Sequence, residues 1–208
     1  MRLRNVKNKD IILKSCPNVL NDPCCYKGKF SELFNNSNAI HLEIGIGKGK
    51  FIKTLALNNP SINYIGLEKQ DSVLALAVRD EHLPSNLILM NYDAKDIGNL
   101  FDKEIDMLYL NFSDPWPKER HAKRRLTSPF FLEIYDKIFK NSCKIQFKTD
   151  NRELFEYSLK SFVDHGYKID KISLDLQNDD SFDNILTEYE EKFIKKGARI
   201  YMVFVYKN

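Results

Sequence analysis

The stretch that decides the fold is residues 39–51, which reads Ala-Ile-His-Leu-Glu-Ile-Gly-Ile-Gly-Lys-Gly-Lys-Phe. Its first part, residues 39–44, is a short, mostly apolar run that ends at a glycine, which predicts a buried strand. Glycines then alternate with other residues, so the backbone can pass close to a ligand while the next helix begins. Such a loop is typical of nucleotide-binding α/β folds, although an ordinary strand-to-helix turn can look the same.

Further apolar runs follow on the carboxyl side of this stretch, and they are 62–67, 87–90, 105–111 and 144–148. Helices are predicted between or after them at 49–58, 71–82, 128–140 and 151–165. Ser128 and Asn151 are the predicted N-caps of the last two helices. This alternation predicts a parallel sheet with crossover helices. Two last strands, 167–176 and 198–206, lack a clear crossover helix between them, which favours a final antiparallel pair.

The length and charge of the chain limit its organisation. With 208 residues, we expect one α/β domain over 37–208. Residues 1–36 are expected to form a basic extension, broken up by Pro17, Pro23 and Gly28, that can stay mobile until a ligand arrives. The net charge of +3 is too small to establish nucleic-acid binding alone.

Composition also excludes several classes of protein. No stretch approaches the roughly 20 apolar residues of a membrane span, and the polar start lacks the apolar run of a secretory signal. We therefore expect a cytoplasmic protein. Its four cysteines have no metal-binding spacing, so no metal site is expected.

Each of the first four predicted strands ends in an acid, and these acids are Glu43, Glu68, Asp93 and Asp114. Ligands of open α/β sheets bind at the carboxyl ends of the strands, so we expect the four carboxylates along one edge. Glu68 is placed to accept hydrogen bonds from ribose hydroxyls, and Asp93 lies where an adenine amino group can donate. The third glycine follows the second by two residues, whereas the dinucleotide pattern has three, which favours S-adenosylmethionine over NAD.

The segment 111–126 combines a fixed acid with a dense positive charge. Asp114 lies between an apolar strand and two prolines, which hold it on a stiff loop. Trp116 on this loop can stack on a base or fill a core. The cations that follow suit a phosphate backbone, although such a run is often only a solvated face; they are Lys118, Arg120, His121, Lys123, Arg124 and Arg125.

On these residues the chain closely resembles the bacterial tRNA (guanine-N7)-methyltransferase family. The match covers most of residues 39–205, and its main segments are the glycine loop, 66–68, 93–94, 111–126, 147–150, 187–190, 192–193 and Gly197. The Asp-Pro-Trp-Pro-Lys block at 114–118 is highly specific to that family. Ser113 departs from it, because many relatives have proline there, and Lys48 and Lys50 occupy a loop that often carries an acid.

The resemblance implies a fold and a reaction. The fold expected for the domain 37–208 is the class I S-adenosylmethionine-dependent methyltransferase fold, a Rossmann-like α/β fold with a seven-stranded, mostly parallel sheet, an antiparallel last strand and helices on both faces. The reaction transfers a methyl group from S-adenosylmethionine to N7 of a guanosine in the variable loop of tRNA and leaves S-adenosylhomocysteine. We expect no obligatory protein partner, and a monomer or homodimer.

The resemblance also implies roles for individual residues. Asp114 is the expected catalytic residue, and the cofactor contacts are expected to be Glu43, Gly45, Gly47, Glu68, Asp93, Ala94 and Asp114. The expected contacts to the target region of tRNA are Lys118, Asp150, Thr187, Glu188, Tyr189 and Glu190. Guanine N7 loses no proton on methylation, so we expect positioning to dominate, with Asp114 and Asp150 accepting from the guanine N1–H and amino group.

Three alternatives remain open at this level. Thr187 and Glu190 have the spacing of a helix capping box, and Asp150 can be the N-cap of a helix that begins near Arg152. The enzyme can act on another RNA or a small molecule. A non-catalytic RNA-binding module with the same fold is the third possibility, although it would have no reason to keep Glu68 and the glycines.

Overall fold

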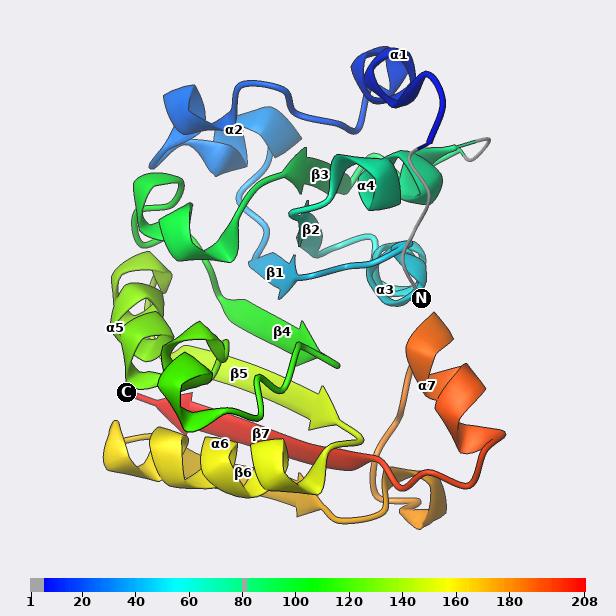
Figure 1. Ribbon diagram of the computed structural model, residues 1–208. Coiled ribbons are helices and arrows are strands. Elements are labelled where there is room, and N and C mark those ends of the chain that lie inside the picture. The colour runs from blue at the N-terminus through cyan, green and yellow to red at the C-terminus, as the bar shows by residue number, and fades with distance from the viewer. Residues whose placement is uncertain (1–5, 80–81) are drawn as a thin grey trace.

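A single seven-stranded sheet forms the centre of the protein in the computed structural model, which describes residues 6–79 and 82–208 (Figure 1). The strands are β1 (Ile40–Ile44), β2 (Asn63–Glu68), β3 (Leu87–Asn91), β4 (Met107–Asn111), β5 (Cys143–Thr149), β6 (Lys168–Ser173) and β7 (Tyr201–Lys207). Their order is β3-β2-β1-β4-β5-β7-β6. β1 to β5 pair in parallel, whereas β7 runs antiparallel to both β5 and β6. The predicted sheet with a reversed last strand is confirmed.

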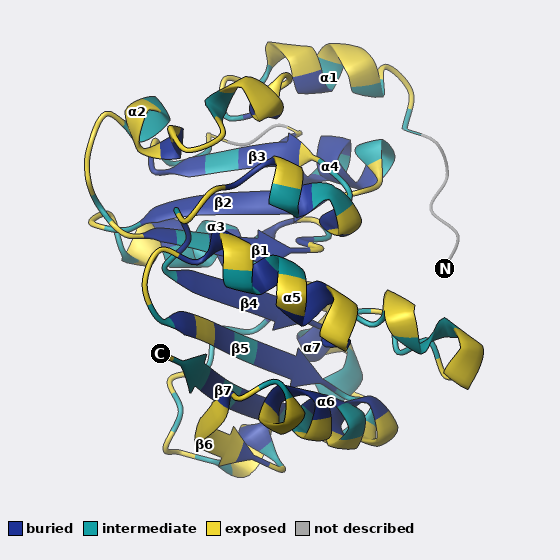
Figure 2. Ribbon diagram, turned by 90° about the vertical axis from the view of Figure 1, so that its left-hand side faces the viewer, coloured by how far each residue is buried: buried dark blue, intermediate teal, exposed yellow. Residues whose placement is uncertain are grey.

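Helices cover both faces of this sheet. The helices are α1 (Lys9–Ser15), α2 (Phe30–Phe34), α3 (Lys50–Asn58), α4 (Asp71–Val78), α5 (Pro129–Ile138), α6 (Arg152–Asp164) and α7 (Glu188–Ile194), with 3-10 turns η1 (Pro23–Tyr26), η2 (Ala94–Asn99), η3 (Glu119–Arg124) and η4 (Leu176–Asn178). One apolar cluster joins the sheet to η2, α5 and α6, and a second joins it to α1, α3 and α4. Figure 2 shows the central strands buried between these layers and β6 exposed at the edge.

Several predicted element boundaries differ from the structure by a few residues. The helix expected over 71–82 ends at Val78, and residues 80–81 lie outside the described part of the chain. The segment 177–197, in which no clear crossover helix was predicted, contains the short helix α7 between the antiparallel strands β6 and β7. α7 has only seven residues, and a helix of that length depends on its cap and its packing more than on any periodic pattern.

Residues 6–36 pack against the domain. Val19 forms a parallel bridge with Leu89, and the Asn18 amide donates to the carbonyls of Pro84 and Leu87. Phe30 is fully buried in the larger core cluster. Backbone N–H groups of Gly28 and Phe30 both donate to Glu104, at 2.8 Å each. Residues 6–36 and the rest of the chain are therefore not two separate packing units on either side of the boundary expected at residue 36. Arg2 and Arg4, two cations of the expected basic extension, lie outside the described residues.

Candidate functional site

The glycine loop is tied to the end of β2. Gly45 and Gly47 have φ angles of 79° and 57°, a left-handed region that side-chain-bearing residues rarely adopt. The N–H groups of Gly45 and Ile46 donate to the Leu67 carbonyl at 2.8 and 3.1 Å. Gly47 N–H donates to Glu68 Oε2 at 3.1 Å. The loop therefore has a fixed position relative to the neighbouring strand.

Glu68 secures this loop with both carboxylate oxygens. Its second oxygen, Oε1, accepts from Gln70 N–H at 2.9 Å. Burial raises the pKa of Glu68, and the backbone donors of Gln70 and Gly47 oppose that effect. Both carboxylate oxygens thus accept from backbone N–H groups, and the expected contact of Glu68 to a cofactor ribose stays a prediction.

A cavity of about 650 Å³ opens at the carboxyl ends of β1 to β4. Gly45, Asp93, Ala94 and Asp114 line it, together with an aromatic wall. That wall consists of Trp116, Phe130 and Phe131, and Phe130 is 47% exposed. The cations at its rim are Lys69, Lys95, Lys123 and Arg124. An apolar, aromatic cavity with a few polar groups suits a nucleoside.

Asp93 is held in place at one end of this cavity. Its carboxylate pairs with Lys69 at 2.7 Å and accepts from Lys95 N–H at 3.2 Å, which caps η2. Burial acts to raise the pKa of Asp93, but the hydrogen bond from Lys69 and the backbone donor outweigh burial, so the pKa is lowered. Asp93 is therefore an ionised acceptor at neutral pH.

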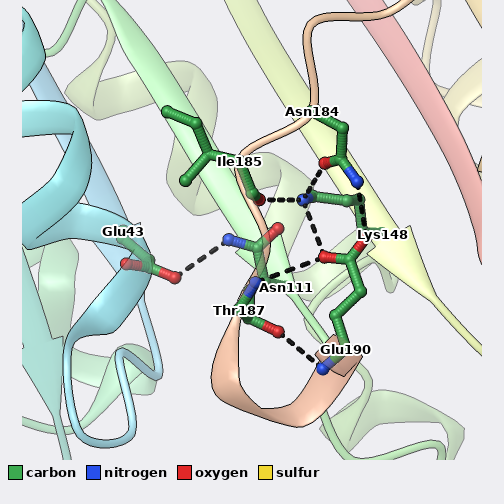
Figure 3. Close-up of polar contacts among 7 residues, drawn as sticks. All are labelled: Glu43, Asn111, Lys148, Asn184, Ile185, Thr187 and Glu190. Atoms are coloured by element: carbon green, nitrogen blue, oxygen red, sulfur yellow. Dashed lines mark hydrogen bonds and ion pairs between the residues drawn. The ribbon is translucent and has the colours of Figure 1, made fainter. Parts of the chain in front are cut away.

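A second cavity, of about 200 Å³, lies between the glycine loop and α7. Glu43 and Asn111 line it, and both side chains are buried, at 2% and 7% exposure. Asn111 Nδ2 donates to Glu43 Oε1 at 2.9 Å (Figure 3). Glu43 Oε2 and Asn111 Oδ1 have no partner among the described residues. Because buried acceptors are seldom left unpaired, this pair indicates a place for a ligand donor.

Burial raises the pKa of Glu43 to about 7, against the opposing effects of the Asn111 hydrogen bond and of Lys148. Glu68 raises it further, since two carboxylates repel each other. A cationic ligand group next to Oε2 would favour the ionised form. The chemistry of this cavity therefore suits an ammonium group.

A buried ion pair anchors α7 to β5. Lys148 and Glu190, both with fully buried side chains, lie 3.2 Å apart. The Lys148 ammonium also donates to Asn184 Oδ1 and to the Ile185 carbonyl, at 2.8 and 3.0 Å (Figure 3). Burial lowers the pKa of Lys148, and Glu190 opposes this. Removing one partner of such a pair typically costs about 3–5 kcal/mol.

Glu190 was expected to contact tRNA, and the structure gives it a different position. Thr187 and Glu190 form the complete capping box of α7, in which Thr187 Oγ1 accepts from Glu190 N–H at 2.9 Å. Glu190 has no exposed surface, so in this conformation a macromolecule cannot reach it. The capping alternative is therefore confirmed for this pair.

The other members of the segment remain at the surface of the site. Tyr189, 40% exposed, donates to Asp150 Oδ2 at 3.3 Å and lies against the ring of Phe112, with centroids 4.9 Å apart. Asp150 does not cap α6, because Asn151 Oδ1 accepts from Leu154 N–H at 2.7 Å. Thr187, Glu188 and Tyr189 all line the second cavity.

Two ion pairs connect α7 to the glycine loop and α3, which lie next to it (Figure 1). Lys48 lies 3.6 Å from Glu188, and Lys50 pairs with Glu191. Both lysines and Glu188 line the smaller cavity, whereas Glu191 does not. The two lysines that depart from the family pattern therefore have acidic partners on α7.

The loop after β4 holds Asp114 between two strained residues. Phe112 and Trp116 have φ angles of 51° and 42°, which cost about 1–3 kcal/mol each in non-glycine residues. Phe112 N–H donates to the Lys148 carbonyl at 2.9 Å, so the strained backbone is anchored to β5. Asp114 is exposed and lines the larger cavity. Strain of this kind clusters at functional sites.

The basic run forms η3 and its flanks. Lys118, Arg120, Lys123 and Arg124 are exposed, as a phosphate-binding surface requires. The Arg124 guanidinium lies 4.8 Å from the centre of the Trp116 ring, and His121 meets that ring edge-on at 5.7 Å. Arg125, which was expected to bind phosphate with the others, is half-buried and donates to the Pro115 and Trp116 carbonyls.

The four strand-end acids lie at the carboxyl-end edge of the sheet, but they do not line a single cavity. Asp93 and Asp114 line the larger cavity, Glu43 lines the smaller one, and Gly45 lines both. Glu68 lines neither cavity, and its Oε2 accepts from the N–H of Gly47. The sequence did not single out Asn111, Lys148 or Asn184, although a lysine inside a buried strand is a signal that it needs a buried partner.

Comparisons with known proteins show which proteins this chain resembles. Residues 37–203 match a family described as putative methyltransferase. The chain is 52% identical to the tRNA (guanine-N(7)-)-methyltransferase of Geobacillus sp. (strain WCH70), over 97% of this chain and 93% of the relative. A tRNA (guanine-N(7)-)-methyltransferase of Streptococcus equi subsp. zooepidemicus is 50% identical, over 97% of both chains.

Solved structures show the same fold at low sequence identity. The 16S rRNA methyltransferase KamB superposes with a TM-score of 0.65 at 14% identity, covering 86% of this chain and 92% of that one. A SAM-dependent methyltransferase from Archaeoglobus fulgidus gives 0.53 at 14% identity, covering 88% and 92%. Within residues 6–79 and 82–208, no helix is long and apolar enough to cross a membrane.

Proposed function

Because the chain belongs to the tRNA (guanine-N(7)-)-methyltransferase family, we propose that it methylates N7 of a guanosine in the variable loop of tRNA. S-adenosylmethionine is the methyl donor and S-adenosylhomocysteine the product. The observation that carries the assignment of the site is that Gly45 lines both cavities, while Asp114 lines the larger one. One elongated cofactor can therefore reach from the smaller cavity to the larger one past the catalytic loop.

The residues of the two cavities fit the two ends of that cofactor. Asp93, an ionised acceptor beside Ala94, suits the adenine amino group. Glu43 Oε2 and Asn111 Oδ1, the buried acceptors without partners, suit the ammonium of the methionine end. Lys48 and Lys50 line the same cavity and suit its carboxylate. When bound, S-adenosylmethionine supplies an electrophilic methyl group.

Asp114 and the aromatic wall serve the target base. A carboxylate at Asp114 accepts from the guanine N1–H and amino group, donors that adenine lacks at those positions. Trp116 and Phe130 present apolar faces on which a base can stack. Orientation of this kind can supply roughly 7–11 kcal/mol in well-aligned systems. Carboxylates also stabilise the positive charge that develops on the purine.

Asp150 supplies a second carboxylate for the guanine N1–H and amino group. Tyr189 holds its carboxylate by a hydrogen bond, and the same tyrosine packs on the strained Phe112. Asp150, Tyr189 and the loop of Asp114 thus form one connected group. The exposed cations of η3 hold tRNA phosphates.

We also propose that the protein is a cytoplasmic monomer or homodimer and that it needs no obligatory protein partner.

The direct test is incubation with bulk tRNA and methyl-labelled S-adenosylmethionine. We expect label in 7-methylguanosine, detected by cleavage chemistry specific for that nucleoside and by mass mapping of nucleosides. Label in another nucleoside, in ribosomal RNA alone or in a small molecule would contradict the proposal. Absence of cofactor binding would instead indicate a non-catalytic RNA-binding module.

Asp114→Asn tests the orienting role of the carboxylate. We expect a fall in kcat of about 100-fold or more, because misalignment at the reacting centre is costly. The Kd for tRNA should change far less, since phosphate contacts dominate affinity. Equal losses in kcat and tRNA affinity would show that Asp114 only helps to bind tRNA.

A further inference from the structure

We propose that Arg125 is a positioning residue that fixes the loop carrying Asp114, and that it does not bind phosphate. The inference rests on the proposed function, because it assigns Arg125 a part in the same methyl transfer. The sequence predicts phosphate binding for both Arg124 and Arg125, whereas the proposal gives the two arginines different roles. Arg124 faces the exposed side of the loop, whereas Arg125 supports the backbone of the loop.

The guanidinium of Arg125 makes three contacts. Nε donates to the Pro115 carbonyl and Nη2 to the Trp116 carbonyl, at 3.1 Å each. Its Cζ lies 4.2 Å from the ring centroid of Tyr157 on α6. A planar fork with donors on neighbouring nitrogens suits two adjacent carbonyls, which a lysine ammonium cannot match in the same way. The guanidinium thus directs two of its five N–H donors at the backbone of the loop.

The two carbonyls flank Trp116, one of the two strained residues of the loop. Trp116 has a φ of 42°, and the peptide groups on both sides of it accept from Arg125. Pro115, whose carbonyl is held, directly follows Asp114. A backbone conformation of this kind persists only where surrounding contacts fix it. Arg125 supplies that support beside the carboxylate.

Arg125 can support the loop that carries Asp114 because hydrogen bonds hold its own part of the backbone in place. Ser128 N–H donates to the Arg125 carbonyl at 2.9 Å, and Tyr135 of α5 donates to the Leu126 carbonyl at 3.0 Å. The buried hydroxyls of Thr127 and Ser158 lie 2.7 Å apart, which ties this segment to α6. The side chain of Arg125 thus extends from a segment that is anchored to α5 and α6 to the loop that carries Asp114.

The chain contains one tryptophan, Trp116, and it lies at the strained position. Its fluorescence therefore reports the state of the loop independently of activity. The test compares Arg125→Lys and Arg125→Gln with wild type by acrylamide quenching, by kcat, and by KM for tRNA and Kd for S-adenosylmethionine. Arg125→Lys keeps the charge and most of the packing but loses the paired hydrogen bonds.

We expect both Arg125 variants to lower kcat by about 10- to 100-fold, because small displacements at the reacting centre are that costly. KM for tRNA and Kd for S-adenosylmethionine should stay within about threefold, and the quenching of Trp116 should increase. Tyr157→Leu, which removes only the ring under the guanidinium, should give a smaller change in the same direction. Arg120→Gln, an exposed arginine of the same run, should instead raise KM for tRNA and lower the salt dependence of binding.

Wild-type kcat and quenching in Arg125→Lys would overturn the proposal, because charge alone would then be sufficient. A loss confined to KM for tRNA and to the salt dependence would show that Arg125 is a phosphate contact. If Arg125→Gln does not fold, as judged by its melting curve, Arg125→Lys and Tyr157→Leu decide the matter. Failure of the wild type to form 7-methylguanosine would refute the proposed function. The quenching data would still test whether Arg125 fixes the conformation of the loop around Trp116.

Discussion

At the scale of single residues, Glu43 has the most informative environment. Burial raises its pKa to about 7, while Asn111 and Lys148 act in the opposite direction and Glu68 adds to the rise. In the unfolded chain the pKa returns to the ordinary value of 4.5, so between these limits the folded protein binds more protons. This carboxyl therefore stabilises the fold fully below pH 4.5 and loses that contribution as the pH rises to about 7.

Glu43→Gln removes this dependence. We expect the free energy of unfolding of the variant, relative to wild type, to rise between pH 4.5 and about pH 7 by on the order of 3 kcal/mol, and to level off above that range. Urea titrations of both proteins at a series of pH values measure the difference. A difference that is constant with pH, or that falls, would contradict the assigned environment.

At the scale of elements, α7 joins three parts of the site. Glu190 anchors it to β5, Tyr189 packs against Phe112 in the loop that carries Asp114, and Glu188 and Glu191 pair with lysines of the glycine loop and α3. The outer pairs are exposed, so each contributes only about 0.2–1 kcal/mol to stability. Their effect on ligand binding in the smaller cavity should be larger than their effect on stability.

The charge swap at Lys50 and Glu191 tests this coupling. Lys50→Glu should weaken S-adenosylmethionine binding several-fold, because it replaces the ion pair with Glu191 by two like charges, and adding Glu191→Lys should restore much of the affinity. Calorimetric titration of the cofactor measures both. Failure of the double variant to recover would mean that Lys50 acts only through the cofactor carboxylate. The swap at Lys160 and Asp164, an exposed pair on α6 that lines neither cavity, is the matched control.

At the scale of the whole molecule, the placement of charge matters more than the net charge of +3. Exposed cations flank the larger cavity, with Lys69 and Lys95 on one side and the η3 residues on the other. Glu188 of α7 lines the smaller cavity instead. A folded polyanion is therefore attracted to the mouth of the cavity that Asp114 lines.

The salt dependence of tRNA binding measures this surface. In Lys118→Gln or Arg120→Gln, the slope of log Kd against log salt should fall by about one for each phosphate that the variant no longer neutralises. Lys160→Gln, at an exposed position of α6 away from both cavities, should leave the slope as in wild type. Unchanged slopes in the η3 variants would show that this run is only solvated.

The sequence by itself determined the parallel sheet, the glycine loop and the strand-end acids. These follow from local chemistry, because apolar runs, glycines and capping residues act within a few positions of the chain. Asn151 at the start of α6 and the capping box at Thr187 are examples that the structure confirms. The family resemblance then identified the reaction from a short and specific block.

Only the tertiary structure decided which way each charged side chain points. Glu190 and Lys148 are buried against each other across 42 residues, and Arg125 reaches back to Pro115 while Arg124 stays exposed. Phe30 enters the core from a segment that the sequence set apart. The physical reason is that burial and long-range hydrogen bonds depend on neighbours distant in the chain, which no local pattern encodes.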